Sequence, residues 1–562
     1  MESVKEELRE LRKWWFDNNK LWFNSNKTDD EEITRKFSVL FYSNIHVDSL
    51  NDVSSKIGYI ILKDQICRHI VRANNLNLNT IDIHLNKVIE FARGFYESNK
   101  NDINCHDFCF TLLPLRHGGI FFDQEYVINE TWNKITSLIK DDVDYEKKLS
   151  VYKNYLKATY ERINDKNIGK VNLLKIDYFN IYEKIQMFVE RFKDILDPET
   201  FNYKNDNALF NFDANSIVNS CKKINKTENI ILSISGGADS MILSLILHKL
   251  GYNFVMVHIN YSNREECEKE KYLLSLWAKF IGKELFIRDI YEINRSKCMT
   301  YDMRKIYEQY TRDARYGAYI QTQKIKDWDN CFVMLGHNYD DCFENIMTNI
   351  TNKQNYQNLN GMEYLSRTIF KENTINFCRP MISITKSQIY DFAHSNLIPY
   401  LYDSTPKWSQ RGKIRDIVKP ALIEWTSNSI EAMHELKDIL SDSMECVDLL
   451  VDNWICKIID KLELSVDGNK VIIETFDKNY KFLKLELTEI VGNKIFWNRF
   501  LLKLEIKISA KSLNNLMLKI SDIKNNFDKI EINSINVVIL HKDNKLYYWK
   551  NIEDKIIFSF HN

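Results

Sequence analysis

Several signals that would place a protein in a class at once are absent from this chain. No run of about 18 apolar residues occurs, so no membrane span is expected. The first residues, Met-Glu-Ser-Val-Lys-Glu-Glu, are too acidic for a transit peptide and lack the apolar core of a secretion signal. Glycine (15) and proline (6) are scarce while Asn, Ile and Lys abound, a bias that indicates an A/T-rich coding sequence rather than an activity.

Paired cysteines and a surplus of positive charge are also missing. The 11 cysteines include no CxxC pair, and Cys105 and Cys109 form only a CxxxC, which is more typical of one helix face than of a metal site. An odd number of cysteines without a secretion signal predicts reduced thiols and a cytoplasmic protein. The formal net charge of −1 gives no support to a broad nucleic-acid-binding surface, so any RNA contact must come from local patches.

What is present indicates a folded chain of several domains. The 562 residues are 44% hydrophobic and 28% charged, and their number predicts about three domains. Residues 1–205 have the apolar spacing of helices, as at Leu8, Leu11 and Trp15, and predict an all-α domain. The Asn- and Asp-rich stretch 202–215 is the best linker candidate.

The rest of the chain divides into two further predicted domains. Residues 216–422 alternate helices with buried strands, which predicts an α/β domain with a doubly wound parallel sheet. Residues 423–562 predict a helical connector, from Ser429 to about Lys461, and a small α+β domain with a hairpin turn at Asp467 and Gly468. The expected strands lie at 230–234, 254–259, 284–287, 332–335, 470–475, 481–487, 503–508, 534–540 and 546–549.

A glycine-rich stretch opens a helix directly after the first of these strands: Ser235, Gly236, Gly237, Ala238, Asp239 and Ser240. Glycines let the backbone approach a ligand and leave N–H groups free to bind an anion, and the helix N-terminus adds partial positive charge. Asp239 can hold a magnesium ion against phosphates, and the two serines can donate hydrogen bonds. The stretch is not a Walker loop, since GxxxxGK(S/T) is absent. An ordinary strand-to-helix turn is the alternative.

Polar residues also follow the strand at 332–335. His337, Asp340 and Asp341 stand at its carboxyl end and at the start of a predicted helix. Such side chains can hold a metal, orient an amine nucleophile or move a proton. The alternative is that Asp340 and Asp341 only cap the helix.

The other candidate residues are basic, and each has a simpler explanation. Arg312 and Arg315 share one helix face, which suits a phosphate clamp or a solvated surface. His258 ends the strand at 254–259 and is by itself typical of a buried, hydrogen-bonded histidine. A last set can contact ATP or RNA phosphates or provide plain surface charge: Arg379, Arg411 and Arg415.

Taken in order, these pieces resemble the tRNA(Ile)-lysidine synthetase family of PP-loop ATP pyrophosphatases. The similarity covers about 228–422 and is carried by SGGADS from Ser235, HINYSNR from His258, RDARY from Arg312, GHNYDDCFE from Gly336, LNGM from Leu359, Arg379-Pro380, and Asp403-Ser404 through Arg411 and Arg415. The resemblance implies a ligase that uses ATP and Mg²⁺ to adenylate the C2 oxygen of the wobble cytidine in an isoleucine tRNA. The amino group of free lysine then displaces AMP. The tail at 540–547 resembles the family's C-terminal domain and is expected to bind tRNA.

The same resemblance implies a role for each candidate. The loop from Ser235 to Ser240 cradles pyrophosphate, with His258 in the ATP site and Asp239 engaging Mg²⁺. Arg315 helps to hold the activated intermediate. The cytidine and the lysine are expected near three residues: His337, Asp340 and Asp341. The expected partners are the anticodon region of the tRNA, free lysine and, as an assembly, a homodimer.

Four positions depart from the family, which usually has histidine at Tyr261, glycine at Ser262, threonine at Asn345 and asparagine at Thr405. These changes leave two alternatives open. One is another PP-loop tRNA-modifying enzyme such as a thiolase, although thiolases commonly need the paired cysteines that this sequence lacks. The other is a catalytically inactive RNA-binding or scaffold protein.

Residues 10–200 resemble an uncharacterised all-helical bacterial family with a DQF-R-N-FR core and a later P-hydrophobic-x-H motif. The resemblance is carried by Trp14-Trp15-Phe16, Trp22, Asp64-Gln65, Arg68, Arg72 and the stretch from Leu113 to His117. It implies no activity. Asp64, Arg68 and His117 are predicted to form a buried polar network.

Overall fold

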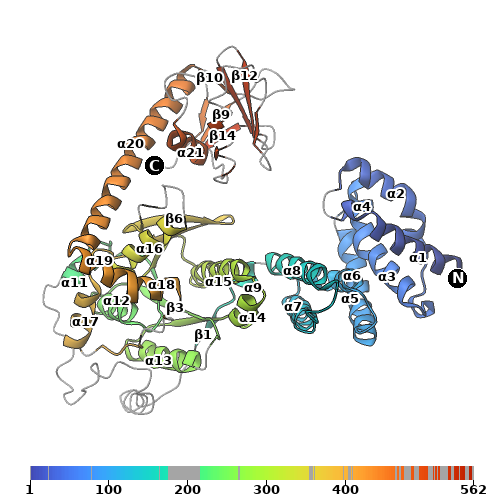
Figure 1. Cartoon of the computed structure of the whole chain (residues 1–562), viewed down its shortest axis with the longest axis horizontal. Coiled ribbons are helices and arrows are strands. Elements are labelled where there is room, and N and C mark those ends of the chain that lie inside the picture. Colours follow the sequence, from blue (N-terminus) through green and yellow to red (C-terminus); the bar gives the residue numbers. More distant parts are fainter. Residues whose placement is uncertain are drawn as a thin grey trace. The chain divides into compact units, whose positions relative to one another are not determined.

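The structure is a computed structural model of the 562-residue chain (Figure 1). It describes residues 2–174 and 216–461, apart from 23–24, 78, 164, 264–265, 353–358, 360, 397, 403–406 and 408, and beyond 461 mainly the elements named below. The chain forms two compact units. The first unit is Met1–His337 with Tyr364–Asp403, and the second unit is Asn338–Glu363 with Ser404–Asn562.

The first unit begins with helices, as the apolar spacing predicts. They are α1 (Glu2–Asp17), α2 (Lys27–Tyr42), α3 (Val53–Ile61), the π-helical turn η3 (Leu62–Ile66), α4 (Cys67–Ala73), α5 (Asn79–Asn99), α6 (Cys105–His117), α7 (Phe121–Thr136), α8 (Tyr145–Glu161) and α9 (Asp165–Ile168). Leu8, Leu11 and Trp15 of α1 are fully buried in the core of these helices. The predicted linker at 202–215 lies outside the described residues, so the domain boundary at 205 stays a prediction.

A seven-stranded sheet follows in the same unit, in the order β1-β4-β3-β2-β5-β7-β6. Its strands are β1 (Asn172–Leu173), β2 (Ile230–Ser233), β3 (Phe254–Asn260), β4 (Leu285–Asp289), β5 (Phe332–Met334), β6 (Leu365–Phe370) and β7 (Asn373–Cys378). The five strands from β4 to β7 run parallel, and the edges β1 and β6 pair antiparallel. The predicted parallel α/β sheet is therefore confirmed. The edge strands β1 and β6 were not predicted, and of β7 the sequence indicates only the end, at Phe377 and Cys378.

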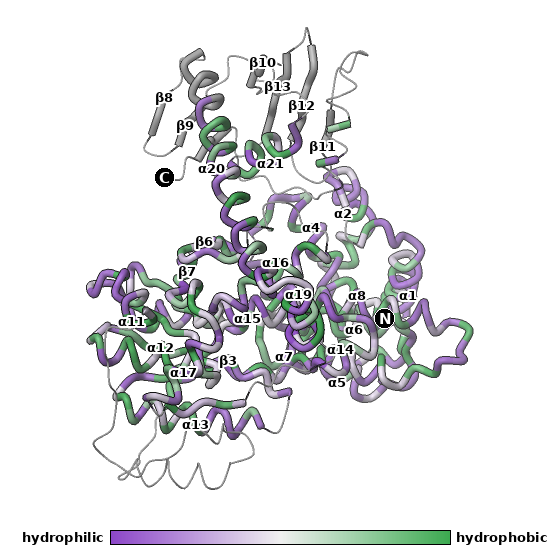
Figure 2. Tube along the Cα trace, turned by 60° about the vertical axis from the view of Figure 1, so that its left-hand side comes forward, coloured by the Kyte–Doolittle hydropathy of each residue, from purple (hydrophilic) through white to green (hydrophobic). Residues whose placement is uncertain are grey.

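Helices cover both faces of this sheet. They are α11 (Ser216–Cys221), α12 (Ala238–Lys249), α13 (Glu266–Phe280), α14 (Arg295–Thr300), α15 (Arg304–Ile325) and α17 (Lys386–Ser395). Ile231 belongs to the core on the α15 side, and its neighbours Ile230 and Leu232 belong to the core that contains α12 and α17. Since both faces are buried, the central strands are apolar at successive positions. Much of α12 is hydrophobic as well (Figure 2).

The N-terminal helices share the core on the α15 side of the sheet. A Cβ atom on Gly169 would lie 2.3 Å from the carbonyl oxygen of Gly317 in α15, so the two backbones touch without room for a side chain. Tyr160 of α8 donates a hydrogen bond to the carbonyl oxygen of Glu292 at 3.0 Å. Arg288 of β4 donates from Nε to the carbonyl oxygen of Ile168 at 2.7 Å. Apolar packing and buried polar contacts thus join the helices to the sheet.

The second unit contains α16 (Tyr339–Thr351), α18 (Gln410–Lys413), the π-helical turn η6 (Ile414–Val418), α19 (Lys419–Trp425), α20 (Ser429–Lys461) and α21 (Lys494–Lys503). Two small sheets follow, in the orders β10-β13-β12-β11 and β14-β9-β8. Their strands are β8 (Ser465–Asp467), β9 (Lys470–Ile473), β10 (Leu483–Glu486), β11 (Ile530–Ile532), β12 (Val537–Lys542), β13 (Lys545–Lys550) and β14 (Ile556–Ser559).

These elements confirm the predicted connector and α+β ending. Helix α20 has the predicted bounds, and hydrophilic and hydrophobic segments alternate along it (Figure 2). The hairpin at Asp467 is confirmed, because β8 and β9 pair antiparallel with Asp467 opposite Lys470. Of the strand predicted at 503–508, Lys503 instead ends α21, and 504–508 lie outside the described residues. Among the helices that the structure describes, none is long and apolar enough to cross a membrane.

Candidate functional site

The glycine-rich loop connects β2 to α12 at the carboxyl end of the parallel sheet. Gly236 has φ of +87°, and a Cβ atom there would lie 2.4 Å from Cδ1 of Leu401. Its carbonyl oxygen accepts a hydrogen bond from the backbone N–H of Leu401 at 2.9 Å. Both the left-handed backbone and the close approach therefore require glycine at this position.

The two serines of the loop differ in exposure and in their hydrogen bonds. Ser240 is 4% exposed, and its Oγ accepts from the backbone N–H of Ser235 at 3.1 Å and donates to the carbonyl oxygen of Gly237 at 3.1 Å. Ser235 is exposed, with its Oγ 3.3 Å from that of Ser240. Ser240 thus fixes the shape of the loop, while Ser235 faces solvent where a ligand can reach it. Ala238 is buried as the first residue of α12.

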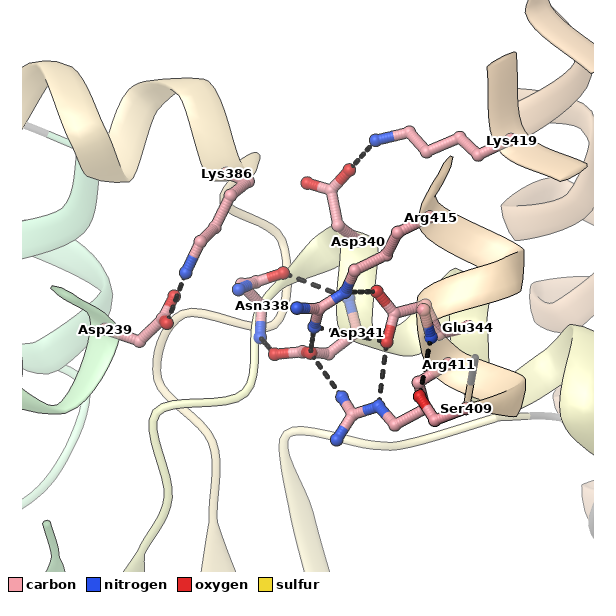
Figure 3. Close-up of polar contacts among 11 residues, drawn as sticks. Asp239, Asn338, Asp340, Asp341, Glu344, Lys386, Ser409, Arg411, Arg415 and Lys419 are labelled. Atoms are coloured by element: carbon pink, nitrogen blue, oxygen red, sulfur yellow. Dashed lines mark hydrogen bonds and ion pairs between the residues drawn. The ribbon is translucent and has the colours of Figure 1, made fainter. Parts of the chain in front are cut away.

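Asp239 lies in the first turn of α12, where the helix dipole favours a carboxylate. Its Oδ2 bonds to Nζ of Lys386, the first residue of α17, at 2.5 Å (Figure 3). Gly336 packs directly on this turn, because a Cβ atom there would lie 3.0 Å from Cβ of Asp239 and 3.1 Å from the nitrogen of Ser240. The sequence analysis did not include Lys386 among the site residues. The available signal was its position in the first turn of the helix that follows Arg379-Pro380.

His258 is 3% exposed in β3, beside the end of β2. Its Nδ1 lies 3.0 Å from the carbonyl oxygen of Ile234, and its Nε2 has no hydrogen-bond partner among the described residues. Burial lowers the pKa of His258, so the imidazole is neutral near pH 7. The neutral ring donates from Nδ1 to the carbonyl and leaves Nε2 as an acceptor. His258 is thus buried, as the simpler explanation expects, but only one of its two ring nitrogens has a hydrogen-bond partner among the described residues.

The fold places Arg312 and Arg315, the two predicted arginines of α15, in different environments. Arg312 is exposed, which matches the solvated alternative, whereas Arg315 is half-buried with its guanidinium carbon 5.7 Å from the ring centre of Tyr316. Tyr319, one turn further on, donates to Oγ of Ser233 at 2.8 Å and ties α15 to the end of β2. Arg315 is therefore the arginine of this pair that the helix packs inward.

His337 and Arg379 follow the neighbouring parallel strands β5 and β7 and meet there. Nε of Arg379 donates to Nδ1 of His337 at 3.3 Å, and its Nη1 donates to Oγ of Ser366 at 2.8 Å. A donor on Nδ1 requires the neutral ring to carry its proton on Nε2. The structure therefore joins a predicted catalytic residue and a predicted phosphate contact in one hydrogen bond.

In the second unit, helix α16 begins with a capping box. Oδ1 of Asn338 accepts from the backbone N–H of Asp341 at 3.0 Å, and Oδ2 of Asp341 accepts from the backbone N–H of Asn338 at 3.3 Å. Asp341 thus caps the helix, but capping is not its only contact, because its Oδ1 also accepts a hydrogen bond from Arg411. Asp340 forms an ion pair with Lys419 instead.

Four charged side chains gather on this unit around α16. Arg411 bonds Asp341 through Nη2 at 2.7 Å and Glu344 through Nε at 2.8 Å. Arg415 bonds Asp341 through Nη2 at 3.3 Å and also pairs with Glu344 (Figure 3). Arg411 and Arg415, predicted to contact phosphates, are thus held by two carboxylates, one of which, Glu344, the site prediction did not include.

Three of the positions that depart from the family are described. Tyr261 is half-buried and packs against the apolar core on the α15 side of the sheet. Ser262 has φ of +49°, the left-handed conformation that glycine adopts without strain, so the serine keeps a glycine-like backbone here. Oδ1 of Asn345 accepts from Nδ2 of Asn349 one turn later at 3.1 Å. Thr405 and Asp403 lie outside the described residues.

A magnesium ion has one carboxylate available at the loop. Within the described ranges, no three His, Cys, Asp or Glu side chains gather as ligands for a metal ion. Magnesium commonly takes one or two carboxylates and completes its shell with waters and substrate phosphates. Asp239 in the first turn of α12 fits that pattern.

Comparison with known proteins agrees with the resemblance found in the sequence. A family model described as a PP-loop domain matches residues 210–422, and one described as a bacterial protein of unknown function (DUF924) matches residues 11–166. The chain therefore contains a PP-loop domain, which implies ATP binding, and a DUF924 domain before it.

Several curated relatives are named tRNA(Ile)-lysidine synthase. The protein of Mycoplasma mycoides subsp. mycoides is 24% identical over 344 residues, covering 59% of this chain and 77% of its own. That of Mesoplasma florum is 27% identical over 301 residues (51% and 69%), and that of Chlamydia muridarum is 27% identical over 242 residues (42% and 71%). Among solved structures, the U34-tRNA thiolase NcsA from Methanococcus maripaludis aligns at 15% identity with a TM-score of 0.33, covering 40% of this chain and 78% of that one.

Proposed function

We propose that this protein is an ATP-dependent tRNA-modifying ligase, which adenylates the wobble cytidine of an isoleucine tRNA and joins lysine to it as lysidine. The observation that carries the proposal is the PP-loop itself, with Gly236 in a left-handed conformation and Asp239 in the first turn of α12. The relatives named tRNA(Ile)-lysidine synthase supply the acceptor and the nucleophile.

The first step transfers AMP to the tRNA. The C2 oxygen of cytidine attacks the α-phosphorus of ATP, and the bond from that phosphorus to the bridging oxygen breaks, so that pyrophosphate leaves. The N–H groups of the loop and the N-terminus of α12 bind the pyrophosphate. Asp239 would hold a magnesium ion, which neutralises charge on the leaving group when bound. Lys386 adds a second positive charge at the same place.

Two further residues of the first unit orient the nucleotide. Nε2 of His258 is a buried acceptor that can take a hydrogen bond from a ribose hydroxyl or the adenine amino group. Arg315 is suited to the phosphate of the adenylated tRNA, because a half-buried guanidinium binds two phosphate oxygens at once. Both residues position the reactants and transfer no proton.

In the second step, the amine of lysine attacks C2 of the cytidine and AMP leaves with the C2 oxygen. His337 carries its proton on Nε2 in the tautomer that Arg379 selects, which suits donation to the departing oxygen. Asp340 and Asp341 are the carboxylates proposed to attract the ammonium group of lysine and to accept the proton it loses. In the structure each already pairs with a cation, Asp340 with Lys419 and Asp341 with Arg411, so the lysine ammonium would have to share or replace these contacts.

The test is a reconstituted reaction. The purified full chain, ATP, Mg²⁺, labelled lysine and an isoleucine tRNA transcript are expected to release pyrophosphate and to incorporate the label, and Asp239→Asn is expected to abolish both. Absence of incorporation across a panel of tRNAs would disprove the lysidine assignment. Sulfur transfer to tRNA under the same conditions would favour the thiolase alternative, and tRNA binding without ATP turnover would favour the inactive binding protein.

A further inference from the structure

The DUF924 domain contains a buried charged cluster that the proposed ligase reaction does not use. Asp64, 1% exposed in the turn η3, accepts from Nε2 of Gln65 at 2.6 Å and from Nη2 of Arg68 at 3.1 Å. Nδ1 of His117 lies 2.9 Å from the same carboxylate. The predicted polar network of Asp64, Arg68 and His117 is therefore confirmed. Burial opposes the charge of Asp64, but its contacts with His117 and Arg68 outweigh burial and lower its pKa to about 2.

Positive charge exceeds negative charge around this network. Arg116 in α6 is 5% exposed, and its guanidinium carbon lies 4.9 Å from the ring centre of Tyr155. Arg162 is an exposed residue directly after α8, and its partial desolvation and the charges of Arg116 and Arg68 lower its pKa. Of these three arginines, only Arg68 forms an ion pair with a carboxylate of the described residues. Three guanidinium groups thus lie within electrostatic reach of one another around Asp64.

Buried polar atoms without partners occur at the same place. Nε of Arg116, Oε1 of Gln124 and the hydroxyl of Tyr155 have no hydrogen-bond partner among the described residues. Gln124 of α7 donates from Nε2 to the carbonyl oxygens of Arg116 and Arg162, at 3.3 Å each, so one framework of α6, α7 and α8 holds all of these groups. Such atoms are rare in folded proteins, and a bound water or ion is one of the explanations for them.

We propose that Arg68, Arg116 and Arg162 form a binding site for the phosphate group of a small phosphorylated molecule. A guanidinium group matches two phosphate oxygens at once, and the two charges of a phosphate monoester would balance the excess of arginine over carboxylate. Tyr155 supplies a further donor, and Oε1 of Gln124 accepts from a hydroxyl group of the ligand.

The burial of the groups favours a terminal phosphate. Arg116 is almost fully covered, whereas a quarter of the Arg68 side chain is exposed and Arg162 reaches solvent. A group that contacts all three must enter end-on, which a terminal phosphate can do and the phosphodiester backbone of RNA cannot. This site is independent of the ligase reaction, because none of its residues belongs to the PP-loop domain.

The test is calorimetric titration of the full chain at constant ionic strength with inorganic phosphate, glycerol 3-phosphate and acetate. Both phosphates are expected to bind, and acetate is not. Arg162→Gln, at an exposed position that tolerates the change, and Tyr155→Phe are each expected to weaken phosphate binding by about tenfold. The matched control is Arg35→Gln, an exposed arginine of α2 in the same domain, which is expected to bind as the unchanged protein does.

The PP-loop can also bind phosphate, so a loop variant completes the design. Gly236→Ala is expected to keep the phosphate binding that Arg162→Gln weakens. If the loop variant loses phosphate binding and Arg162→Gln keeps it, the phosphate lies in the PP-loop and the proposal is wrong. Equal binding of acetate, or absence of phosphate binding at millimolar concentration, would also overturn it.

Discussion

Lys386 and Asp239 form an ion pair between the first turns of two helices, 147 residues apart in the sequence. The pair places a cation beside the loop that is to receive the phosphates of ATP. About a fifth of the Asp239 side chain and a quarter of the Lys386 side chain remain exposed. Both charges are therefore accessible to a ligand as well as to each other.

Lys386→Gln is expected to raise the KM for ATP by about tenfold and to change kcat much less, because one charged contact with phosphate would be lost. Pyrophosphate release at varied ATP measures both constants. Lys226→Gln, which removes the charge of an exposed lysine in the same unit, serves as control and is expected to leave KM unchanged. An unchanged KM in Lys386→Gln would show that this lysine only holds Asp239.

Gly236→Ala is expected to reduce pyrophosphate release by at least about 100-fold, because the added Cβ would push the loop away from Leu401 and misplace Asp239. Gly251 provides a matched control. It has φ of +76°, close to the +87° of Gly236, but nothing lies within 4 Å of its Cβ position. Gly251→Ala therefore carries the same backbone cost of about 1–2 kcal/mol and should remain active. Equal activity losses in Gly236→Ala and Gly251→Ala would show that backbone strain alone causes the loss.

Glu344→Gln is expected to loosen the start of α16. Glu344 is 4% exposed, and removal of its negative charge leaves Arg411 and Arg415 with Asp341 as their one carboxylate partner among the described residues. Since Arg411 is half-exposed, we expect a loss of about 2 kcal/mol rather than the full cost of breaking a buried pair. Amide hydrogen exchange in α16 would then accelerate roughly 30-fold.

The control for this prediction is Glu424→Gln, at an exposed glutamate of α19. Its exchange rates are expected to match those of the unchanged protein. If exchange in α16 is also unaltered in Glu344→Gln, the four-residue cluster contributes nothing to the stability of this helix.

The sequence was a good guide where burial is two-sided and a poor one at the edges of the sheet. Strands β2 to β5 are apolar at successive positions because helices cover both faces. Edge strand β6 reverses the expected pattern, since Leu365 and Ile369 are exposed while Ser366 and Thr368 are half-buried. Tertiary pairing with β7, which no local pattern encodes, makes it a strand.

The site shows the same division between local and distant information. The PP-loop is contiguous, so its residue types and order predict a phosphate site. Arg411 and Arg415 lie about 70 residues from their carboxylate partners, and charge alone cannot tell a carboxylate contact from a phosphate contact. The available signal was spacing: Asp341 and Glu344 stand three apart and the arginines four apart, which suits two facing helical turns.

Mild acid is expected to destabilise the second unit through His434. Its ring stacks on Tyr339 at 3.5 Å, and burial, together with the charge of Lys437, lowers its pKa to about 4. Below the ordinary pKa of about 6.5 the unfolded chain binds a proton that the folded chain refuses. Stability is therefore lost as pH falls from about 6.5 to 4 and levels off below that range.

His434→Phe keeps a ring against Tyr339 and removes the titration. Hydrogen exchange in α16 between pH 7 and pH 4, corrected for the intrinsic pH dependence of exchange, is expected to show a loss of about 1 kcal/mol in the unchanged protein, reduced because His434 is partly solvated. In the variant this loss should vanish. A persisting loss would assign the acid sensitivity to another group.

The contact of Gly169 with Gly317 bears on how this gene could be rearranged. A side chain at either position would separate the helices from the sheet, and strand β1, just beyond Gly169, pairs with β4. Recombination that removed the helices before Gly169 would uncover apolar side chains of α15, such as Tyr310, which packs on Tyr160. The helices and the sheet share one core, so neither part can be exchanged without a matching apolar surface on the other.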